Sequence, residues 1–224
     1  MAATTQSVAP PPFFTQWNDK MQPVETVMRT APVIPVLVID KVEDARPIAE
    51  ALVEGGLNVL EVTLRTPAAL EVIAEMAKVP GAIVGAGTVL NARDLDRALQ
   101  VGAQFIVSPG LTETLARAAI SQNVAFLPGV ANAGDIMRGL DLGLDRFKFF
   151  PAEASGGLKA LKALAAPFGN VRFCPTGGIT VESAPSWLAE PAVLCVGGSW
   201  VVKPGPVDRA AITAAARAAA SLPR

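Results

Sequence analysis

A short apolar run, a turn rich in Gly, Pro or Thr, and about ten residues with apolar side chains at helical spacing recur along the chain from Asn18 onward. Such runs are typical of buried parallel strands, and apolar side chains three or four residues apart predict amphipathic helices. The expected strands are 33–39, 58–64, 82–85, 104–107, 124–127, 146–150, 171–174 and 192–196. Helices are expected at 42–54, 68–78, 92–101, 113–122, 133–142, 157–166, 181–189 and 207–221, with 18–30 as an extra leading helix.

This succession of about eight strand–helix units predicts the fold class α/β. Within that class we expect a (β/α)8 TIM barrel with an extra N-terminal helix, although the same alternation would suit an open, doubly wound sheet. A chain of 224 residues can form one such barrel, so a single catalytic domain is expected over 18–224. Residues 1–17 contain three consecutive prolines and few charges, and we expect a flexible tail there. In a barrel, functional side chains lie at the carboxyl ends of the strands and in the loops that follow.

The composition removes several classes of chemistry. The chain has no histidine and no tyrosine, so acid–base steps must use carboxylates, lysines, hydroxyls or water, and a histidine-bearing metal site is excluded. Cys174 and Cys195 stand in separate apolar segments, and we expect buried thiols in a reducing cytoplasm. Neither a metal nor an organic cofactor is expected.

Charge and hydropathy favour a small-molecule partner. The net charge is −1 and Lys and Arg form no cluster, which argues against binding to nucleic acid or to an anionic membrane. No stretch approaches the length of a membrane span. Charged residues make up 17% of the chain, against roughly a quarter in typical soluble domains, and the mean hydropathy is +0.40. Apolar surface hidden by self-association would explain these values, so a homo-oligomer is expected.

Lys148 is a lone amine in the apolar segment RFKFFPAE. Side chains alternate between the two faces of a strand, so Lys148 is expected beside Phe150, on the face opposite Phe147 and Phe149. Desolvation disfavours the ammonium form of a buried lysine, and a neutral amine can attack a carbonyl carbon. Lys148 is therefore a candidate nucleophile, although a lysine that reaches solvent or a buried acid would produce the same pattern.

The segment EVTLRT places two charged residues on one face of a strand. Glu61, Thr63 and Arg65 alternate with apolar residues, so their side chains are expected to face the interior of a barrel, which normally holds branched apolar residues. Glu61 could transfer protons there, and Arg65 could bind a substrate carboxylate through two hydrogen bonds. An ion pair between Glu61 and Arg65 that merely fills the barrel is the alternative.

Hydroxyls and backbone amides gather at the ends of the third and fourth expected strands. The segments GAGTVL and SPGLT place Thr88, Ser108, Pro109 and Gly110 at the predicted rim. GAGTVL is no dinucleotide fingerprint, because its sixth position is leucine. Its glycines could form an ordinary tight turn, whereas the Thr88 hydroxyl could orient a carboxylate or a carbonyl.

Paired glycines follow the last two expected strands, in PTGGIT and GGSW. Phosphate sites of barrels lie in these loops, where backbone N–H groups can approach an anion. A phosphate monoester is therefore the expected substrate class, although either pair of glycines alone could be a simple turn. The candidate residues are Thr176, Gly177, Gly178, Gly198 and Ser199.

The order of EVTLRT, GAGTVL, SPGLT, RFKFFPAE, FCPTGGI and VGGSW resembles the bacterial 2-keto-3-deoxy-6-phosphogluconate (KDPG) aldolase and 4-hydroxy-2-oxoglutarate aldolase family, class I aldolases of the Entner–Doudoroff route. The resemblance extends from about Asn18 to the C-terminus and implies a homotrimer of (β/α)8 barrels. It implies that Lys148 forms a Schiff base and that Glu61 is the acid/base carboxylate. It further implies that Arg65 and Thr88 surround the pyruvate carboxylate, and that the phosphate end is held by Thr176, Gly177, Gly178 and Ser199.

The resemblance implies cleavage of the phosphorylated 2-keto-3-deoxy sugar acid KDPG to pyruvate and D-glyceraldehyde 3-phosphate. It also implies a side activity on 4-hydroxy-2-oxoglutarate. Two other classes stay open: a phosphosugar isomerase or synthase in which Lys148 acts only as a charge, and a non-catalytic phosphometabolite-binding protein. The preference between the gluconate and galactonate epimers also stays open, because the placement of hydroxyl partners decides it.

Overall fold

The computed structural model describes residues 23–223, so the expected flexible tail over 1–17 and the first part of the expected leading helix, 18–22, lie outside the described residues. The strands are β1 (Val33–Leu37), β2 (Val59–Thr63), β3 (Ile83–Gly87), β4 (Phe105–Val107), β5 (Ala125–Leu127), β6 (Gly129–Val130), β7 (Arg146–Phe149), β8 (Arg172–Pro175) and β9 (Val196–Gly198). The helices are α1 (Pro23–Thr30), α2 (Ala45–Glu54), α3 (Ala69–Met76), α4 (Ala92–Gln100), α5 (Glu113–Ser121), α6 (Ala133–Asp141), α7 (Gly157–Ala165), α8 (Ala184–Leu188) and α9 (Arg209–Ala220), with a 3-10 helix η2 (Val42–Asp44) before α2.

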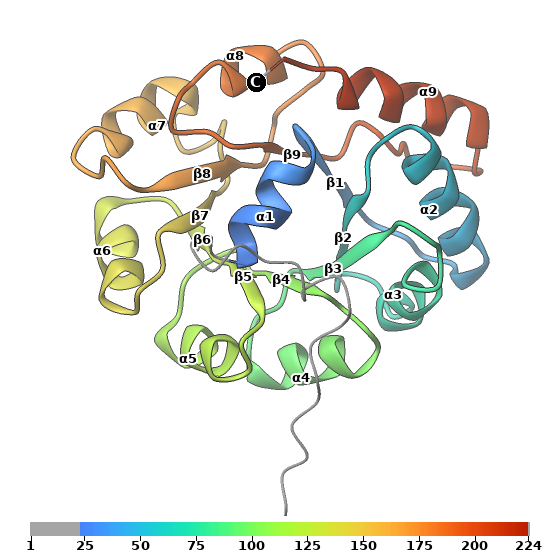
Figure 1. The fold of residues 1–224 in the computed structure, drawn as a ribbon, viewed down its shortest axis with the longest axis horizontal. Coiled ribbons are helices and arrows are strands. Elements are labelled where there is room, and N and C mark those ends of the chain that lie inside the picture. Colours follow the sequence, from blue (N-terminus) through green and yellow to red (C-terminus); the bar gives the residue numbers. More distant parts are fainter. Residues whose placement is uncertain (1–22, 224) are drawn as a thin grey trace, which may run out of the picture.

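The strands form two parallel sheets within a ring of helices (Figure 1). The larger sheet has the order β5-β4-β3-β2-β1-β9 and curves into a half-barrel, and the smaller has the order β6-β7-β8. Only Pro128 separates β5 from β6. At the other boundary, isolated parallel bridges pair Phe173 with Val193 and Thr176 with Gly197. The expected α/β class with parallel strands is confirmed.

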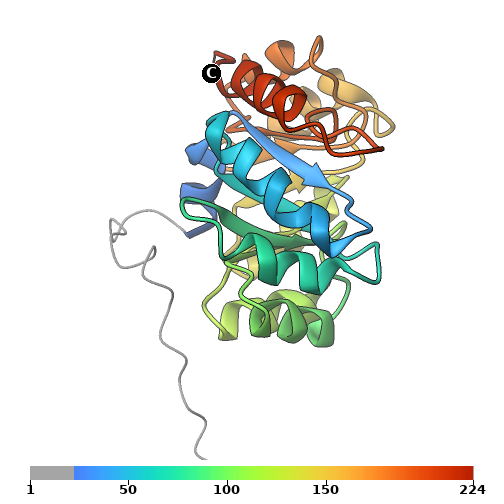
Figure 2. The ribbon, with the colours of Figure 1, turned by 90° about the vertical axis from the view of Figure 1, so that its right-hand side faces the viewer.

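Alternation of side chains divides the apolar core into two layers. The outer layer lies between strands and helices and contains Phe147 and Phe149 of β7 and Trp187 of α8. The inner layer contains Phe105 of β4 and Met28 of α1. Lys148 therefore projects away from its two neighbouring phenylalanines, as the period of a strand predicts. Figure 2 shows α1 and the outer helices on different sides of the strands.

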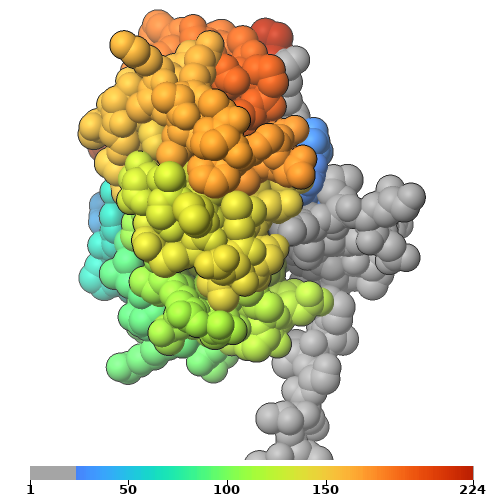
Figure 3. All heavy atoms as spheres, turned by 90° about the vertical axis from the view of Figure 1, so that its left-hand side faces the viewer, coloured from blue at the N-terminus to red at the C-terminus, as the bar shows by residue number. Residues whose placement is uncertain are grey.

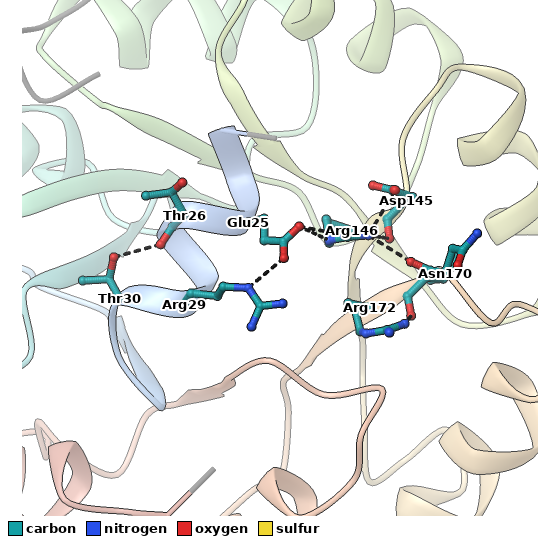
Figure 4. A network of polar contacts seen from close by, with 9 residues as sticks. Glu25, Thr26, Arg29, Thr30, Asp145, Arg146, Asn170 and Arg172 are labelled. Atoms are coloured by element: carbon teal, nitrogen blue, oxygen red, sulfur yellow. Dashed lines mark hydrogen bonds and ion pairs between the residues drawn. The ribbon is translucent and has the colours of Figure 1, made fainter. Parts of the chain in front are cut away.

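Helix α1 is tied to the first residue of β7 by an ion-pair network (Figure 4). Glu25 accepts hydrogen bonds from Arg146 Nη2 at 2.7 Å and Nε at 3.0 Å, and from Arg29 Nε at 2.7 Å. Arg146 Nη1 also donates to the backbone carbonyls of Asp145 and Asn170. Burial alone would raise the pKa of the Glu25 carboxyl, but the hydrogen bonds from the two arginines outweigh it and hold the pKa below its usual value.

Several outer helices begin at residues whose side chains cap them. Asn91, Thr112, Asn132 and Asp208 each accept the backbone N–H of the residue three positions later. Such a cap satisfies one of the free donors in the first turn, which explains why α4, α5, α6 and α9 begin there. Figure 3 shows the packed outer surface that α6 to α8 form on one side of the molecule. Across residues 23–223, no helix is both long and apolar enough to cross a membrane.

The last strand differs most from expectation. It was predicted at 192–196 but spans Val196–Gly198, because its pairing with β1 runs from Val33↔Val196 to Pro35↔Gly198. The two-residue strand β6 was not predicted, and the helix expected at 181–189 is reduced to Ala184–Leu188. The other predicted elements match within a few residues at their ends, where strand pairing and helix caps set the boundaries.

Candidate active site

Lys148 and Glu61 form a buried ion pair inside the ring of strands. Lys148 Nζ lies 3.0 Å from Glu61 Oε1 and 3.4 Å from Oε2, although the two residues are 87 positions apart in the chain. Glu61 is 3% exposed and Lys148 is 6% exposed. The half-buried Phe150 places its ring centroid 5.5 Å from the Lys148 amine, as the alternation along RFKFFPAE predicted.

Burying two charged side chains costs free energy, so the presence of this ion pair favours a chemical role over a purely structural one. Two charges removed from water regain their desolvation penalty only if the geometry is good, and an apolar pair of similar volume is often equally stable. The structure places a buried acid beside Lys148, a partner that the non-catalytic interpretation also allowed. A buried acid–base pair is also what a nucleophilic lysine with a neighbouring proton carrier requires.

A glycine makes room for the Glu61 carboxylate. A Cβ atom built on Gly87, at the end of β3, would lie 2.2 Å from Glu61 Oε1 and 2.9 Å from Cδ. Gly87 is paired with Thr63 in the parallel ladder between β2 and β3. Any side chain at this position would push the carboxylate out of its place, so Gly87 determines the position of Glu61.

Arg65 and Thr88 lie just beyond the ends of β2 and β3. Arg65 is exposed, and its Nε donates to Thr63 Oγ1 at 3.1 Å, while the Thr63 hydroxyl donates to the Leu37 carbonyl at 2.9 Å. The alternative ion pair between Glu61 and Arg65 is not formed, because Lys148 takes the carboxylate. Thr88 has a φ of 58°, a left-handed conformation that costs about 1–3 kcal/mol at a non-glycine residue and often marks a functional position.

Pro109 and its neighbours form the turn after β4. The buried Ser108 donates its hydroxyl to the Gly110 carbonyl at 2.7 Å, whereas Pro109 and Gly110 are exposed. A Cβ atom on Gly129 would lie 2.1 Å from the Pro109 carbonyl oxygen. Gly129 thereby allows β6 to approach this turn, and it pairs in register with Lys148 on its other side.

The candidate phosphate loops after β8 and β9 lie side by side. Thr176 is bridged to Gly197, and a Cβ atom on Gly197 would lie 2.3 Å from Thr176 Oγ1. Gly177 and Gly178 have φ values of 104° and 80°, a region that side chains disfavour, so the turn requires both glycines. Ser199 is exposed at the end of β9.

Gly198 has a packing role that sequence reasoning did not anticipate. A Cβ atom built there would lie 2.0 Å from the Trp200 ring, so the tryptophan fills the space next to it. Thr63, Gly87 and Gly197 were also missed as supports of the site. Thr63 shares the interior face of Glu61, which was a usable signal, whereas the close approaches at the two glycines depend on strand register.

The described part of the chain contains no cluster of three or more Cys, Asp or Glu side chains arranged to hold a metal ion. Cys174 and Cys195 are both buried and form no disulfide, as expected. Cys174 of β8 pairs in register with Lys148 of β7, and its side chain lies in the inner apolar layer.

Comparison with known proteins gives one consistent result. Residues 24–216 match the family model "KDPG and KHG aldolase". The crystal structure of the 2-keto-3-deoxy-6-phosphogluconate aldolase of Zymomonas mobilis ZM4 with 3-phosphoglycerate shares 65% identity, with a TM-score of 0.90 over 91% of this chain and 98% of that one. The KHG/KDPG aldolase of Escherichia coli K12 is 55% identical over 80% of this chain and 84% of its own length.

A third relative was crystallised with a covalent intermediate. The KDPG aldolase of Legionella pneumophila, with pyruvate captured at low pH as a carbinolamine, is 43% identical, with a TM-score of 0.86 over 90% of this chain and 100% of that one. The resemblance inferred from the six segments is thereby confirmed. The chain belongs to the KDPG and KHG aldolase family.

Proposed function

We propose that the protein is a class I aldolase, an aldehyde-lyase that cleaves KDPG to pyruvate and D-glyceraldehyde 3-phosphate. The observation that carries this proposal is the buried contact of 3.0 Å between the Lys148 amine and the Glu61 carboxylate. The names of the relatives support it, since they are KDPG and KHG aldolases. A side activity on 4-hydroxy-2-oxoglutarate is part of the proposal, because the E. coli relative is named for both activities.

The reaction begins when a proton passes from the Lys148 ammonium to Glu61, and the neutral amine attacks the C2 ketone of the substrate. Glu61 returns that proton to the carbinolamine hydroxyl, water leaves, and an iminium ion forms. The Glu61 carboxylate then takes the proton of the C4 hydroxyl while the C3–C4 bond breaks and its electrons move into the iminium. Glyceraldehyde 3-phosphate departs and a pyruvate enamine remains on Lys148.

The second half of the reaction uses the same two residues. Glu61 gives its proton to C3, which regenerates the iminium ion, and water hydrolyses this ion to pyruvate and the Lys148 ammonium. Every proton that Glu61 accepts is returned, so the cycle ends with the initial ion pair. No step requires a metal or an organic cofactor.

Residues around the pair would hold the two ends of the substrate. Arg65 and Thr88 are assigned to the carboxylate, with Pro109 and Phe150 as walls beside the reacting carbon. Thr176, Gly177, Gly178, Gly198 and Ser199 are assigned to the phosphate, which is supported by the positive φ values of two glycines. Binding at both ends aligns the bond that breaks.

We also propose that the two sheets are parts of one (β/α)8 barrel, with α1 as the extra N-terminal helix, and that 18–224 is a single catalytic domain. The isolated bridges between β8 and the β9 region support closure of the ring. A cytoplasmic homotrimer is proposed as the working form. Exposed apolar side chains at Leu90, Ile120, Met137 and Leu140 support self-association.

The decisive experiment traps the covalent intermediate. Pyruvate and sodium borohydride are added to the protein, and intact mass and peptide mapping locate any reduced adduct. We expect one pyruvyl group on Lys148 in the wild type and none in Lys148→Met, while Lys159→Met, a change at an exposed lysine of α7, keeps the adduct. A folded wild type that cleaves KDPG without forming an adduct would show that Lys148 acts only as a charge and would refute the class I mechanism.

A further inference from the structure

We infer that Glu153 is a positioning residue that holds the candidate phosphate loop in its binding shape and keeps its own negative charge away from the phosphate. Glu153 follows β7, five residues after Lys148, and was not predicted as a site residue. The inference rests on the proposed function, because it assigns a task at the phosphate end of the same site. It makes Glu153 a determinant of preference for phosphorylated substrates.

The backbone amides of Ala152 and Glu153 bind the candidate phosphate loop after β8. The amide of Ala152 donates to the Thr176 carbonyl at 2.8 Å, and the amide of Glu153 donates to the Gly177 carbonyl at 3.0 Å. These bonds continue the parallel pairing of β7 and β8 beyond the ends of both strands. The first two residues of the loop are therefore fixed by the chain segment that follows the nucleophile.

The side chain of Glu153 supports the third loop residue. A Cβ atom built on Gly178 would lie 2.8 Å from both Cβ and Cγ of Glu153, so the backbone of Gly178 rests directly on these carbons. Gly178 also has a φ of 80°, which a side chain would disfavour. Truncation of Glu153 would remove this support and allow the loop amides to change direction.

The carboxylate of Glu153 is held by a buried indole. Trp187 Nε1 donates to Glu153 Oε1 at 3.1 Å. Trp187 itself is 1% exposed, and its ring centroid lies 6.4 Å from that of Phe149. The other oxygen, Oε2, lies near the first residue of α7, since a Cβ atom on Gly157 would be 3.2 Å away. A helix N-terminus favours a negative charge, so α7 adds a favourable electrostatic environment to the position that the indole hydrogen bond fixes.

This arrangement matters because Glu153 is an exposed acid next to a loop assigned to a dianion. A carboxylate turned toward the phosphate would repel it, and misdirected backbone amides would bind it less well. Neither change would touch the ends of β2 and β3, where the substrate carboxylate is assigned. Loss of the Glu153 contacts should therefore weaken the binding of phosphorylated substrates specifically.

The test compares a reaction that needs the phosphate with one that does not. Steady-state cleavage of KDPG gives KM and kcat, and exchange of the pyruvate methyl protons with deuterated water reports on Lys148, Glu61 and the carboxylate end without using the phosphate loops. For Glu153→Ala we expect the KM for KDPG to rise about tenfold, because the loop loses its contact with Cγ and the carboxylate no longer ties this segment to Trp187, while pyruvate exchange stays within about twofold. Glu153→Gln can still accept the indole hydrogen bond and should keep KM within about threefold.

A second variant tests the indole separately. Trp187→Phe keeps an aromatic ring in the core but removes the donor, and the KM for KDPG should again rise about tenfold. If the charge of the released carboxylate is responsible, the double variant Trp187→Phe/Glu153→Gln should recover part of this loss. Thermal melts of each variant show whether it is folded.

The possible failures are distinguishable. A KM for KDPG that changes less than twofold in Glu153→Ala, or a loss of pyruvate exchange equal to the loss of cleavage, would show that Glu153 has no specific task at the phosphate loop. A folded wild type that neither exchanges pyruvate protons nor forms a trapped adduct would instead overturn the proposed function, and this inference with it.

Discussion

The pair that we propose to react, Lys148 and Glu61, is positioned by parts of the chain that take no part in the proposed reaction. Glu61 lies where it does because Gly87 has no side chain, and Lys148 reaches it from the far side of the ring because β7 turns its amine inward. Alternation along the two segments predicted both inward-facing residues. Their contact could not be predicted, since it joins positions 87 residues apart and depends on how the strands are arranged.

The first prediction at this scale concerns Glu61. Glu61→Gln keeps the size of the side chain but cannot accept and return a proton, so exchange of the pyruvate methyl protons should fall by about 10²-fold or more. Borohydride trapping at Lys148 should persist but build up more slowly, because the amine remains while the group that takes and returns its proton is lost. Glu71→Gln, a change at an exposed acid of α3, is the matched control and should leave exchange unchanged. Normal exchange in Glu61→Gln would mean that another group is the base.

The second prediction concerns Gly87, the glycine next to the Glu61 carboxylate. The added methyl group of Gly87→Ala would lie 2.2 Å from Glu61 Oε1, so the carboxylate must move, and the overpacking should cost about 1–3 kcal/mol in the free energy of unfolding. We expect KDPG cleavage and pyruvate exchange to fall together in the folded variant. Gly169→Ala is the control, because a methyl group there meets no atom within 4 Å. Full activity in Gly87→Ala would separate Glu61 placement from catalysis.

At the scale of elements, the sequence pattern predicted where most helices and strands lie, whereas strand pairing determined the bounds of the short strands. Apolar runs and helical spacing located the elements because each strand is buried and each outer helix buries one face. The position of β9 was missed because the apolar run around Cys195 continues without a break, and only pairing with β1 decides which part is the strand. The three-residue β4 and the two-residue β6 likewise owe their bounds to neighbouring strands.

Helix α1 provides a prediction with a defined pH dependence. The pKa of Glu25 is held below its ordinary value by Arg29 and Arg146, so its ion pairs stabilise the fold above about pH 4.5 and are lost as the pH falls through the lowered pKa. Glu25→Gln should therefore cost about 1–3 kcal/mol at pH 7, and this cost should shrink as the pH falls below about 4.5. In thermal melts this corresponds to about 2–4 °C for each kcal/mol.

The control for this prediction is Glu43→Gln, which removes one exposed carboxylate from η2. It should change the melting temperature little at pH 7. A deficit in Glu25→Gln that is the same at pH 7 and pH 3 would show that the charge of Glu25 does not contribute to the attachment of α1 to β7.

At the scale of the whole molecule, the proposed trimer can be measured directly. Among the described residues, six large apolar side chains are more than 40% exposed, at Val38, Leu90, Ile120, Met137, Leu140 and Val181. Burial of such surface between copies would stabilise an assembly. Size-exclusion chromatography with light scattering should give a mass three times the 23.1 kDa of one chain, and the value should not change on tenfold dilution. A monomeric mass would leave the exposed side chains unexplained and refute the trimer.

The buried Lys148–Glu61 contact also affects which molecules leave the protein unmodified. Small reactive aldehydes attack exposed lysines in a cell, but this amine is almost fully enclosed and already donates to an acid. In the proposed mechanism a carbonyl compound reacts only while it is held beside the pair, as the residues assigned to the carboxylate would hold KDPG or pyruvate. The contact that would prepare the amine for its substrate would thereby also shield it from chance electrophiles.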